Sequence, residues 1–280
     1  MEQSVFKGMA TALVTPMNKG GSIDYPALGR LLEFQIEQGA DALVVMGTTG
    51  EASTLEEREK WELAEFAIHR VDKRVPVIIG TGSNDTRRSA MLSREAQHLG
   101  ADGLLLVTPY YNKTSQEGLI RHFETIADQV SVPVILYNVP TRTGVNICPE
   151  TCCRLADHPN ICGLKEASGN LSQVARTAAL CRGKLAIYSG PDSSCTIPWR
   201  SGSDFCCGKS SAWGNCTALP SLLGGKDRRK RSTAAGTFGF DECYVLGCKS
   251  YSCKGRTGDF WHVPGGLQTA LGAFGTGEKR

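Results

Sequence analysis

One lysine of the sequence, Lys165, stands where an amine could act as a nucleophile. It ends a short apolar run, residues 161–165, and small polar residues follow it. A β-strand can carry such a lysine into a nearly dry pocket, where the loss of hydration lowers the pKa of the amine. A neutral amine can attack a keto group and form a Schiff base. The residue alone leaves a second interpretation open, because most lysines at strand ends are solvated surface groups.

Seven apolar runs alternate with helical patterns between Met9 and Gly190. The runs comprise residues 10–14, 42–46, 75–79, 103–107, 132–136, 161–165 and 185–188. The stretch 56–67 has apolar residues three and four positions apart, as an amphipathic helix requires. Apolar strands separated by helices predict an α/β fold with a parallel sheet. We predict a (β/α)8 TIM barrel with seven recognisable strands, since such barrels contain about 250 residues. A doubly wound open sheet is the alternative, but no glycine-rich dinucleotide motif follows the first strand.

Polar clusters follow several of these runs, at the places where a (β/α)8 barrel positions its reactive side chains. They comprise residues 47–51, 108–112, 137–144, Lys165 itself and 189–190. Because the carboxyl ends of parallel strands meet at one face of a barrel, we expect these clusters to lie close together.

Four of the motifs resemble the 4-hydroxy-tetrahydrodipicolinate synthase (dihydrodipicolinate synthase) family in order and spacing. They are Gly-Thr-Thr-Gly-Glu at 47–51, Thr-Pro-Tyr-Tyr-Asn at 108–112, Tyr-Asn-Val-Pro with Arg-Thr-Gly at 137–144, and Gly-Leu-Lys-Glu-Ala at 163–167. The resemblance covers residues 5–192. It implies a carbon–oxygen lyase of the Schiff-base (class I) aldolase superfamily. This enzyme condenses pyruvate with L-aspartate 4-semialdehyde in lysine and diaminopimelate biosynthesis. No motif indicates a metal, a nucleotide or another cofactor.

The resemblance also assigns catalytic roles to individual residues. Lys165 matches the lysine that forms the Schiff base with pyruvate, and Tyr137 matches the general acid that acts on the carbinolamine. A phenol with a pKa near 10 needs a relay to exchange protons near neutral pH. Thr49 and Tyr111 resemble the other members of that relay. Because the family's counterpart of Tyr111 reaches into a neighbouring subunit, we expect a homo-oligomer, a dimer of dimers.

Substrate-binding residues are implied in the same way. Backbone N–H groups at Thr48 and Thr49 could hold the pyruvate carboxylate. Arg142 resembles the residue that binds the carboxylate of aspartate semialdehyde, and its planar guanidinium suits a bidentate contact. Gly190 resembles a glycine whose backbone lies against pyruvate.

One departure from the family concerns feedback inhibition. Many members are inhibited by lysine at a dimer-interface site beside the residue that matches Tyr110. That site uses two histidines, an asparagine and a glutamate, and the matching positions here are Glu57, Lys60, Asn84 and Arg88. Lys60 and Arg88 would repel the ammonium groups of a lysine effector, so we expect weak or absent inhibition.

The composition changes near Asp192. Residues 191–280 contain seven of the 12 cysteines, and their 12 Lys and Arg exceed their 7 Asp and Glu by five. The remainder has 19 basic and 21 acidic residues, a net charge of −2. Strand and helix periodicity also ends there. A zinc module is disfavoured because no Cys-x-x-Cys pair occurs. Disulfides do not suit an intracellular enzyme body. The basic run 226–231 lacks the interleaved aromatic residues of a nucleic-acid site.

A shift of reading frame accounts for this change. The codons that encode Phe240–Thr257 can be translated again from the second base of each codon. The resulting peptide can contain the Asn-Pro-x-Pro-x-Lys motif of the family's C-terminal segment. The same shift converts residues 199–203 into Gly-Ala-Leu-Gly-Ala, similar to the family's loop before its eighth strand. We therefore predict a catalytic barrel body at 1–192. We predict an out-of-frame segment at 193–280, in place of the eighth strand and C-terminal helices.

Three functional hypotheses follow. The first is the synthase, whose exact chain here would be inactive if the frameshift prevents folding. The second is a related keto-acid aldolase, similar to N-acetylneuraminate lyase. Thr49 and Arg142 favour the synthase over this alternative. The third is a non-catalytic protein whose basic, cysteine-rich segment binds nucleic acid or metal. No apolar run is long enough to span a bilayer, and no leader pattern precedes the body. We therefore expect a soluble cytoplasmic protein without membrane or nucleic-acid partners.

Overall fold

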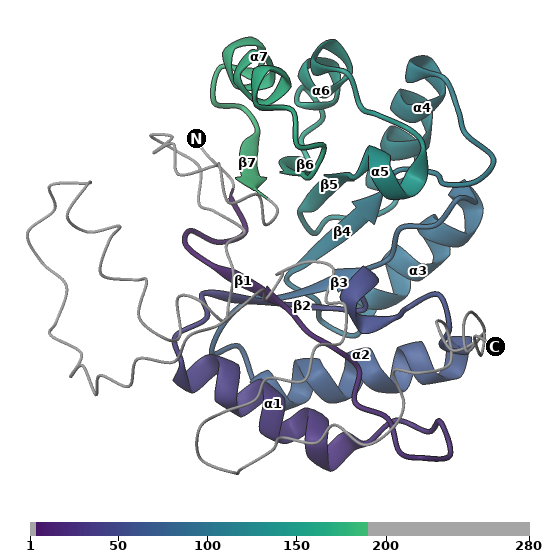
Figure 1. Ribbon diagram of the computed structural model, residues 1–280, viewed down its shortest axis with the longest axis vertical. Helices are drawn as coiled ribbons and strands as arrows, with labels where there is room; N and C mark the ends of the chain where they lie inside the picture. The colour runs from purple at the N-terminus through teal and green to yellow at the C-terminus, as the bar shows by residue number, and fades with distance from the viewer. Residues whose placement is uncertain (1–3, 190–280) are drawn as a thin grey trace, which may run out of the picture.

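The computed structural model describes residues 4–189, which form one sheet of parallel strands flanked by helices (Figure 1). Strand order in the sheet follows the chain from β1 to β7. The strands are β1 Ala10–Ala12, β2 Ala42–Val45, β3 Val77–Gly80, β4 Gly103–Val107, β5 Val134–Asn138, β6 Ile161–Glu166 and β7 Ala186–Ser189. The predicted α/β class and its seven parallel strands are confirmed. The predicted replacement of the eighth strand and C-terminal helices lies outside the described residues.

Helices connect consecutive strands along the outer side of the curved sheet (Figure 1). They are α1 Tyr25–Glu37, α2 Glu57–Val71, α3 Thr86–His98, α4 Gln116–Ala127, α6 Pro149–Leu155 and α7 Leu171–Cys181. Several begin at a capping side chain, as the first N–H groups of a helix require. Asp24, Asp85, Ser115 and Asn170 each accept a hydrogen bond from a backbone N–H in the first turn. Short helices η1 Thr48–Gly50 and α5 Pro140–Thr143 follow β2 and β5.

The fifth strand is displaced toward its C-terminus relative to the predicted run 132–136. Pro133 has no N–H to donate, and the ladder begins where the N–H of Val134 donates to the carbonyl of Asn160 at 2.7 Å. The strand then continues through Tyr137 and Asn138, which pair in register with Lys165 and Glu166 of β6. Residues expected in a loop therefore belong to the sheet, where neighbouring strands hold them.

Buried side chains form one cluster on each face of the sheet. The outer cluster lies between strands and helices and includes Leu43, Leu63 and Phe123. The inner cluster contains side chains of alternate strand residues together with Phe6, a residue that precedes β1. The ring of Phe6 stacks on Tyr188 of β7 with centroids 4.6 Å apart. Since these residues lie at opposite ends of the described chain, the sheet curls far enough to bring its two edges toward each other.

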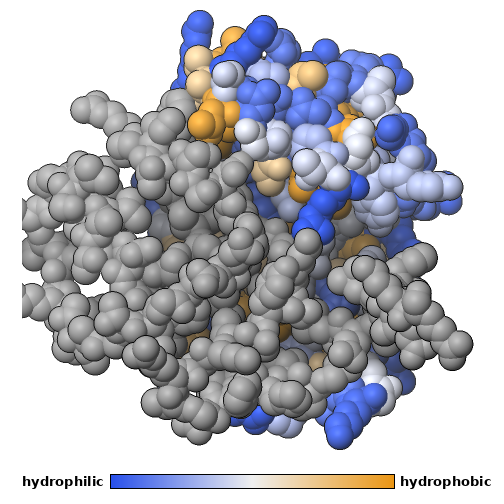
Figure 2. Space-filling view, in the orientation of Figure 1, coloured by the Kyte–Doolittle hydropathy of each residue, from blue (hydrophilic) through white to orange (hydrophobic). Residues whose placement is uncertain are grey.

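The part of the surface described by the structure is largely hydrophilic on the face shown in Figure 2, with small separate hydrophobic areas over the upper helices. No helix among residues 4–189 is long and apolar enough to cross a membrane.

Candidate active site

Lys165 and Tyr137 are brought together at the carboxyl ends of β6 and β5. The two residues are direct register partners, so their side chains emerge on the same face of the sheet. The Lys165 Nζ lies 3.8 Å from the centroid of the Tyr137 ring. Only 1% of Lys165 and 3% of Tyr137 are exposed. The sheet thus holds a buried amine against the ring of a buried phenol.

The environment of Lys165 favours the neutral amine. Burial lowers the pKa of Lys165 well below its ordinary value, and the nearby positive charge of Arg142 lowers it further. A desolvated ammonium beside a second cation loses stability relative to the free base. The predicted effect of a dry pocket on this amine is therefore present, and the neutral form is the one that can attack a carbonyl carbon.

Tyr137 is linked to the loop after β2 through Thr48. Burial raises the pKa of the Tyr137 hydroxyl, while the charge of Arg142 and a hydrogen bond with the Thr48 side chain act in the opposite direction. The relay role expected for Thr49 stays a prediction, and the neighbouring Thr48 side chain also acts on the pKa of the phenol. The Thr49 Oγ1 is buried and has no hydrogen-bond partner among the described residues. A hydroxyl in that position remains available for a ligand atom.

The loop that carries both threonines is tightly constrained. Met46 and Glu51, on either side of it, have positive φ angles of 57° and 52°. Such angles cost energy for residues other than glycine, and they cluster at functional sites. Gly80 of β3 allows the loop to approach, since a Cβ there would lie 2.2 Å from the Met46 carbonyl oxygen. The turn is therefore fixed in place by its neighbours.

Two further predicted residues are described and differ in position. Arg142 lies in the short helix α5, is exposed, and is close enough to act electrostatically on both Lys165 and Tyr137. Tyr111 has a φ of 70° and is 92% exposed, so its side chain projects from the surface. Gly190 lies outside the described residues. The structure therefore gathers Lys165, Tyr137 and Thr48, with Arg142 nearby.

Sequence reasoning missed Tyr188 of β7. It is the register partner of Lys165 on the side opposite Tyr137 and is fully buried. Its hydroxyl donates to the carbonyl of Phe6 at 3.3 Å. Gly163 leaves room for the ring, because a Cβ there would lie 2.8 Å from a Tyr188 ring carbon. Alternation along the predicted strand 185–188 could have placed this tyrosine on the same face as Lys165.

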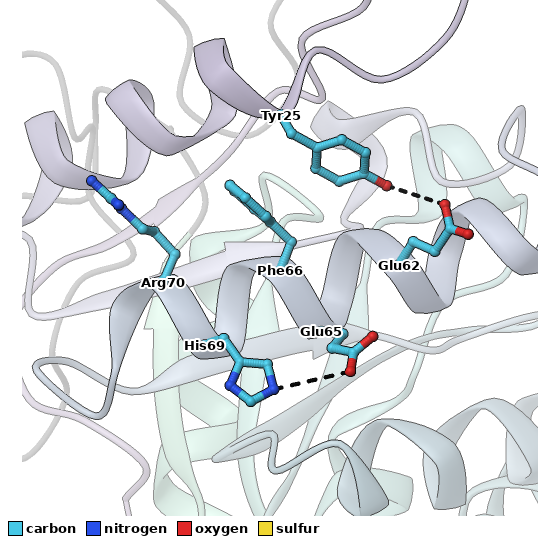
Figure 3. A pocket seen from close by; sticks show the side chains of 6 residues that line it. All are labelled: Tyr25, Glu62, Glu65, Phe66, His69 and Arg70. Atoms are coloured by element: carbon cyan, nitrogen blue, oxygen red, sulfur yellow. Dashed lines mark hydrogen bonds and ion pairs between the residues drawn. The ribbon is translucent and has the colours of Figure 1, made fainter.

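A separate groove of about 570 Å³ lies on the outer helices, between α1 and α2 (Figure 3). Its walls are Tyr25, Glu62, Glu65, Phe66, His69 and Arg70. The Tyr25 hydroxyl donates to Glu62 at 3.5 Å, and His69 lies 4.0 Å from the carboxylate of Glu65. None of the residues gathered around Lys165 lines this groove.

Comparison with known proteins gives consistent results. A 4-hydroxy-tetrahydrodipicolinate synthase of Clostridium acetobutylicum is 52% identical over 189 residues, which are 68% of this chain and 64% of that protein. The chain thus spans less than two thirds of the length of that relative. A dihydrodipicolinate synthase of Acinetobacter baumannii, solved in complex with pyruvate, is 48% identical with a TM-score of 0.65. That match covers 66% of this chain and 63% of the other.

A dihydrodipicolinate synthase of Bacillus anthracis superposes with a TM-score of 0.73 at 38% identity, over 78% of this chain and 76% of that one. The model of the Dihydrodipicolinate synthetase family matches residues 5–218, well over half of the sequence. A match of that extent, together with the parallel sheet and the buried lysine on β6, shows that this chain belongs to the Dihydrodipicolinate synthetase family.

Proposed function

We propose that the protein forms a Schiff base between Lys165 and pyruvate and condenses it with L-aspartate 4-semialdehyde. The observation that carries this proposal is the fully buried Lys165 amine held against the Tyr137 ring. The names of the relatives and the pyruvate complex of the Acinetobacter protein support the same substrate and reaction. The reaction is that of 4-hydroxy-tetrahydrodipicolinate synthase, a lyase.

The first steps follow from the groups in the pocket. The neutral Lys165 amine attacks the keto carbon of pyruvate, and the resulting carbinolamine must lose its hydroxyl as water to give the imine. Tyr137 stands at the amine and can deliver the proton for that departure. A hydrogen bond with the Thr48 side chain lowers the pKa of Tyr137, which supports Thr48 as the group that returns the proton. We therefore assign to Thr48 the relay role expected for Thr49.

The substrate carboxylates have candidate partners on two loops. Thr49 carries a buried hydroxyl without a partner among the described residues and suits the pyruvate carboxylate, with the backbone N–H groups of the same loop. Arg142 is exposed on α5, and its charge acts on both Lys165 and Tyr137. Its guanidinium can bind the carboxylate of aspartate semialdehyde in a bidentate manner. We keep Gly190 as a proposed pyruvate contact.

Assembly and location are also part of the proposal. The 92% exposure of Tyr111 suits a side chain that completes its contacts in a second subunit, and we propose a homo-oligomer, a dimer of dimers. The described residues include five free cysteines, which suits the reducing conditions of the cytoplasm.

The covalent step can be tested directly. The full chain is incubated with pyruvate and borohydride, and its peptides are weighed by mass spectrometry. We expect one reduced pyruvate adduct, on the peptide that contains Lys165, and none in a Lys165→Met variant. Turnover of aspartate semialdehyde then separates the synthase from a related keto-acid aldolase. An unmodified Lys165 at saturating pyruvate in a folded sample would refute the assignment.

We further propose that residues 193–280 are translated out of frame. The 189 residues aligned with the Clostridium protein are close in number to the 192 of the predicted body. The family model matches residues up to 218, which lie beyond the proposed shift near residue 193. The position of the shift therefore depends on the reading of the codons alone. A closed (β/α)8 barrel needs an eighth strand between β1 and β7, the edge strands of the described sheet.

Expression of this chain beside a version with one base removed near codon 193 tests the frameshift. We expect higher soluble yield and turnover from the second version. Equal yield and equal turnover would show that residues 193–280 serve the protein as they stand.

A further inference from the structure

A buried pair of polar residues lies directly behind the reactive pair. Asn138 follows Tyr137 on β5 and Glu166 follows Lys165 on β6, and the two are register partners. Because successive strand residues point to opposite faces, this pair lies on the side of the sheet that faces the helices. Asn138 is fully buried and Glu166 is 5% exposed.

Hydrogen bonds join the two side chains across the strands. The Asn138 Nδ2 lies 3.2 Å and 3.0 Å from the two carboxylate oxygens of Glu166. The Asn138 Oδ1 accepts from the N–H of Ile147 at 3.0 Å, and its carbonyl accepts from the N–H of Ala167 at 2.8 Å. Asn138 thereby ties the end of β5 both to β6 and to the segment that follows α5.

Glu166 is fixed from three directions. Besides Asn138, its carboxylate accepts from the backbone N–H of Ser168 at 2.7 Å and from the Gln173 Nε2 at 3.2 Å. Gln173, on α7, also exchanges two hydrogen bonds with the side chain of Asn146, at 2.8 Å and 3.1 Å. Asn146 in turn accepts from Asn138 at 2.9 Å. The four side chains form a closed network that links β5, β6, α7 and the segment after α5.

This network acts on the two residues that the chemistry needs. Tyr137 and Lys165 are each one peptide unit away from a member of the pair, and they share the same register. A shift of β5 against β6 would move the phenol relative to the amine, and a displacement of about 1 Å in a reacting pair can reduce the rate about 100-fold. Hydrogen bonds through a buried carboxylate are stronger than those between neutral groups and resist such a shift.

We propose that Asn138 and Glu166 are positioning residues, which hold the Tyr137 hydroxyl and the Lys165 amine at the separation required for Schiff-base formation. This inference rests on the proposed function, because it assigns the network a role in that reaction. Neither residue touches the inner face of the sheet, so both act through the strand residues that precede them.

Three variants of the full chain test the proposal. Glu166→Gln places an amide NH2 group against donors that now face a carboxylate. Asn138→Asp places a second carboxylate beside that of Glu166. The exchange variant Asn138→Asp/Glu166→Gln restores one amide-to-carboxylate contact between the strands. Asn160→Ala is the control: Asn160 precedes β6 at the opposite end and donates to the carbonyls of Ala127 and Val130 at 3.0 Å and 2.6 Å. It loosens the same strand without reaching the pocket.

The first readout is the rate of borohydride trapping at rising pyruvate concentration. We expect each single variant to lose about 10- to 100-fold in the maximal trapping rate. The half-saturating pyruvate concentration should stay near that of the original chain, because the carboxylate contacts on the loop after β2 are untouched. The exchange variant should recover part of the rate, and Asn160→Ala should keep it.

The second readout does not require pyruvate. Lys165 is reductively methylated across a pH series, and its modified fraction is compared with that of exposed lysines. We expect the single variants to move the half-modification pH of Lys165 upward, since water admitted beside the amine favours the ammonium. The exchange variant should move it back.

The two readouts separate the two proposals. A chain that is not trapped by pyruvate, but whose methylation profile moves and returns as described, refutes the proposed function and still shows that Asn138 and Glu166 hold the surroundings of the Lys165 amine in place. Wild-type trapping rates and an unmoved profile in both single variants would overturn the positioning role and leave the function intact. Equal losses in Asn160→Ala and Glu166→Gln would also overturn it, because any loosening of β6 would then suffice.

Discussion

Replacement of Lys165 by methionine should stabilise the fold in a pH-dependent way. Lys165 is fully buried, and its pKa in the folded chain lies well below the ordinary value of 10.5 because of burial and then because of Arg142. Between the lowered pKa and 10.5 the unfolded chain binds a proton at this site that the folded chain does not. The free energy of unfolding therefore rises with pH in that window, by about 1.4 kcal/mol for each pH unit.

The methionine variant lacks this site, so the difference between the two chains isolates it. Met has nearly the length of the lysine stem and no group that requires hydration. We expect Lys165→Met to have the higher free energy of unfolding near neutral pH. Its advantage should shrink by about 1.4 kcal/mol per unit as the pH approaches 10.5, and should be constant above that value.

Urea denaturation from about pH 7 to about pH 10 measures how the free energy of unfolding changes with pH in wild type and in Lys165→Met. Lys184→Met is the matched control. The hydrogen bond and ion pair with Asp157 raise the pKa of the exposed Lys184 above 10.5, so its stabilising contribution is fully present below that value, and the difference between wild type and Lys184→Met should not change from about pH 7 to about pH 10. A difference between wild type and Lys165→Met that does not change with pH would refute the reasoning that burial keeps this amine neutral.

Three more predictions concern turnover and its control. Tyr137→Phe should lower kcat by about 100-fold or more while leaving the KM for pyruvate nearly unchanged, as the loss of a proton donor does. Thr48→Val should lower kcat through the same step. A kcat equal to that of the original chain in both variants would exclude the relay. Arg142→Lys should raise the KM for aspartate semialdehyde about 10-fold or more, without reducing pyruvate trapping, because a point charge replaces a bidentate contact; a KM that does not change would remove Arg142 from substrate binding. Submillimolar lysine should not inhibit, since Lys60 and Arg88 occupy the positions where its ammonium groups would bind; titration of initial rates checks this, and half-inhibition in that range would contradict it.

The sequence identified the strands because their apolar runs are continuous and separated by helical patterns. It placed the end of β5 too early, at residue 136, because Tyr137 and Asn138 look like loop residues when polarity alone is considered. In the structure both continue the ladder beside Lys165 and Glu166. Pairing with a neighbouring strand decided the boundary, and that neighbour lies 28 residues further along the chain.

Individual contacts at the site were harder to anticipate. Adjacent threonines after β2 have the same chemistry, and polarity alone does not show that the Thr48 side chain acts on the pKa of Tyr137 while the Thr49 hydroxyl is buried without a partner among the described residues. That geometry depends on positive φ angles at Met46 and Glu51, which no composition rule signals. Tyr188 was missed for a different reason, since its role depends on register with Lys165 across two strands.

Strand alternation explains how this site combines an uncharged amine with firm positioning. Inward-facing residues of β5, β6 and β7 place two aromatic side chains beside Lys165 and keep its amine dry. The next residues, Asn138 and Glu166, face outward. There they form strong hydrogen bonds, and the carboxylate of Glu166 does not place its negative charge beside the amine. A carboxylate on the inner face would favour the ammonium form and oppose nucleophilic attack. The sheet therefore separates the two tasks onto its two faces: the inner face surrounds the Lys165 amine, and the outer face holds the strands that carry it, so that loosening the outer face also admits water to the amine.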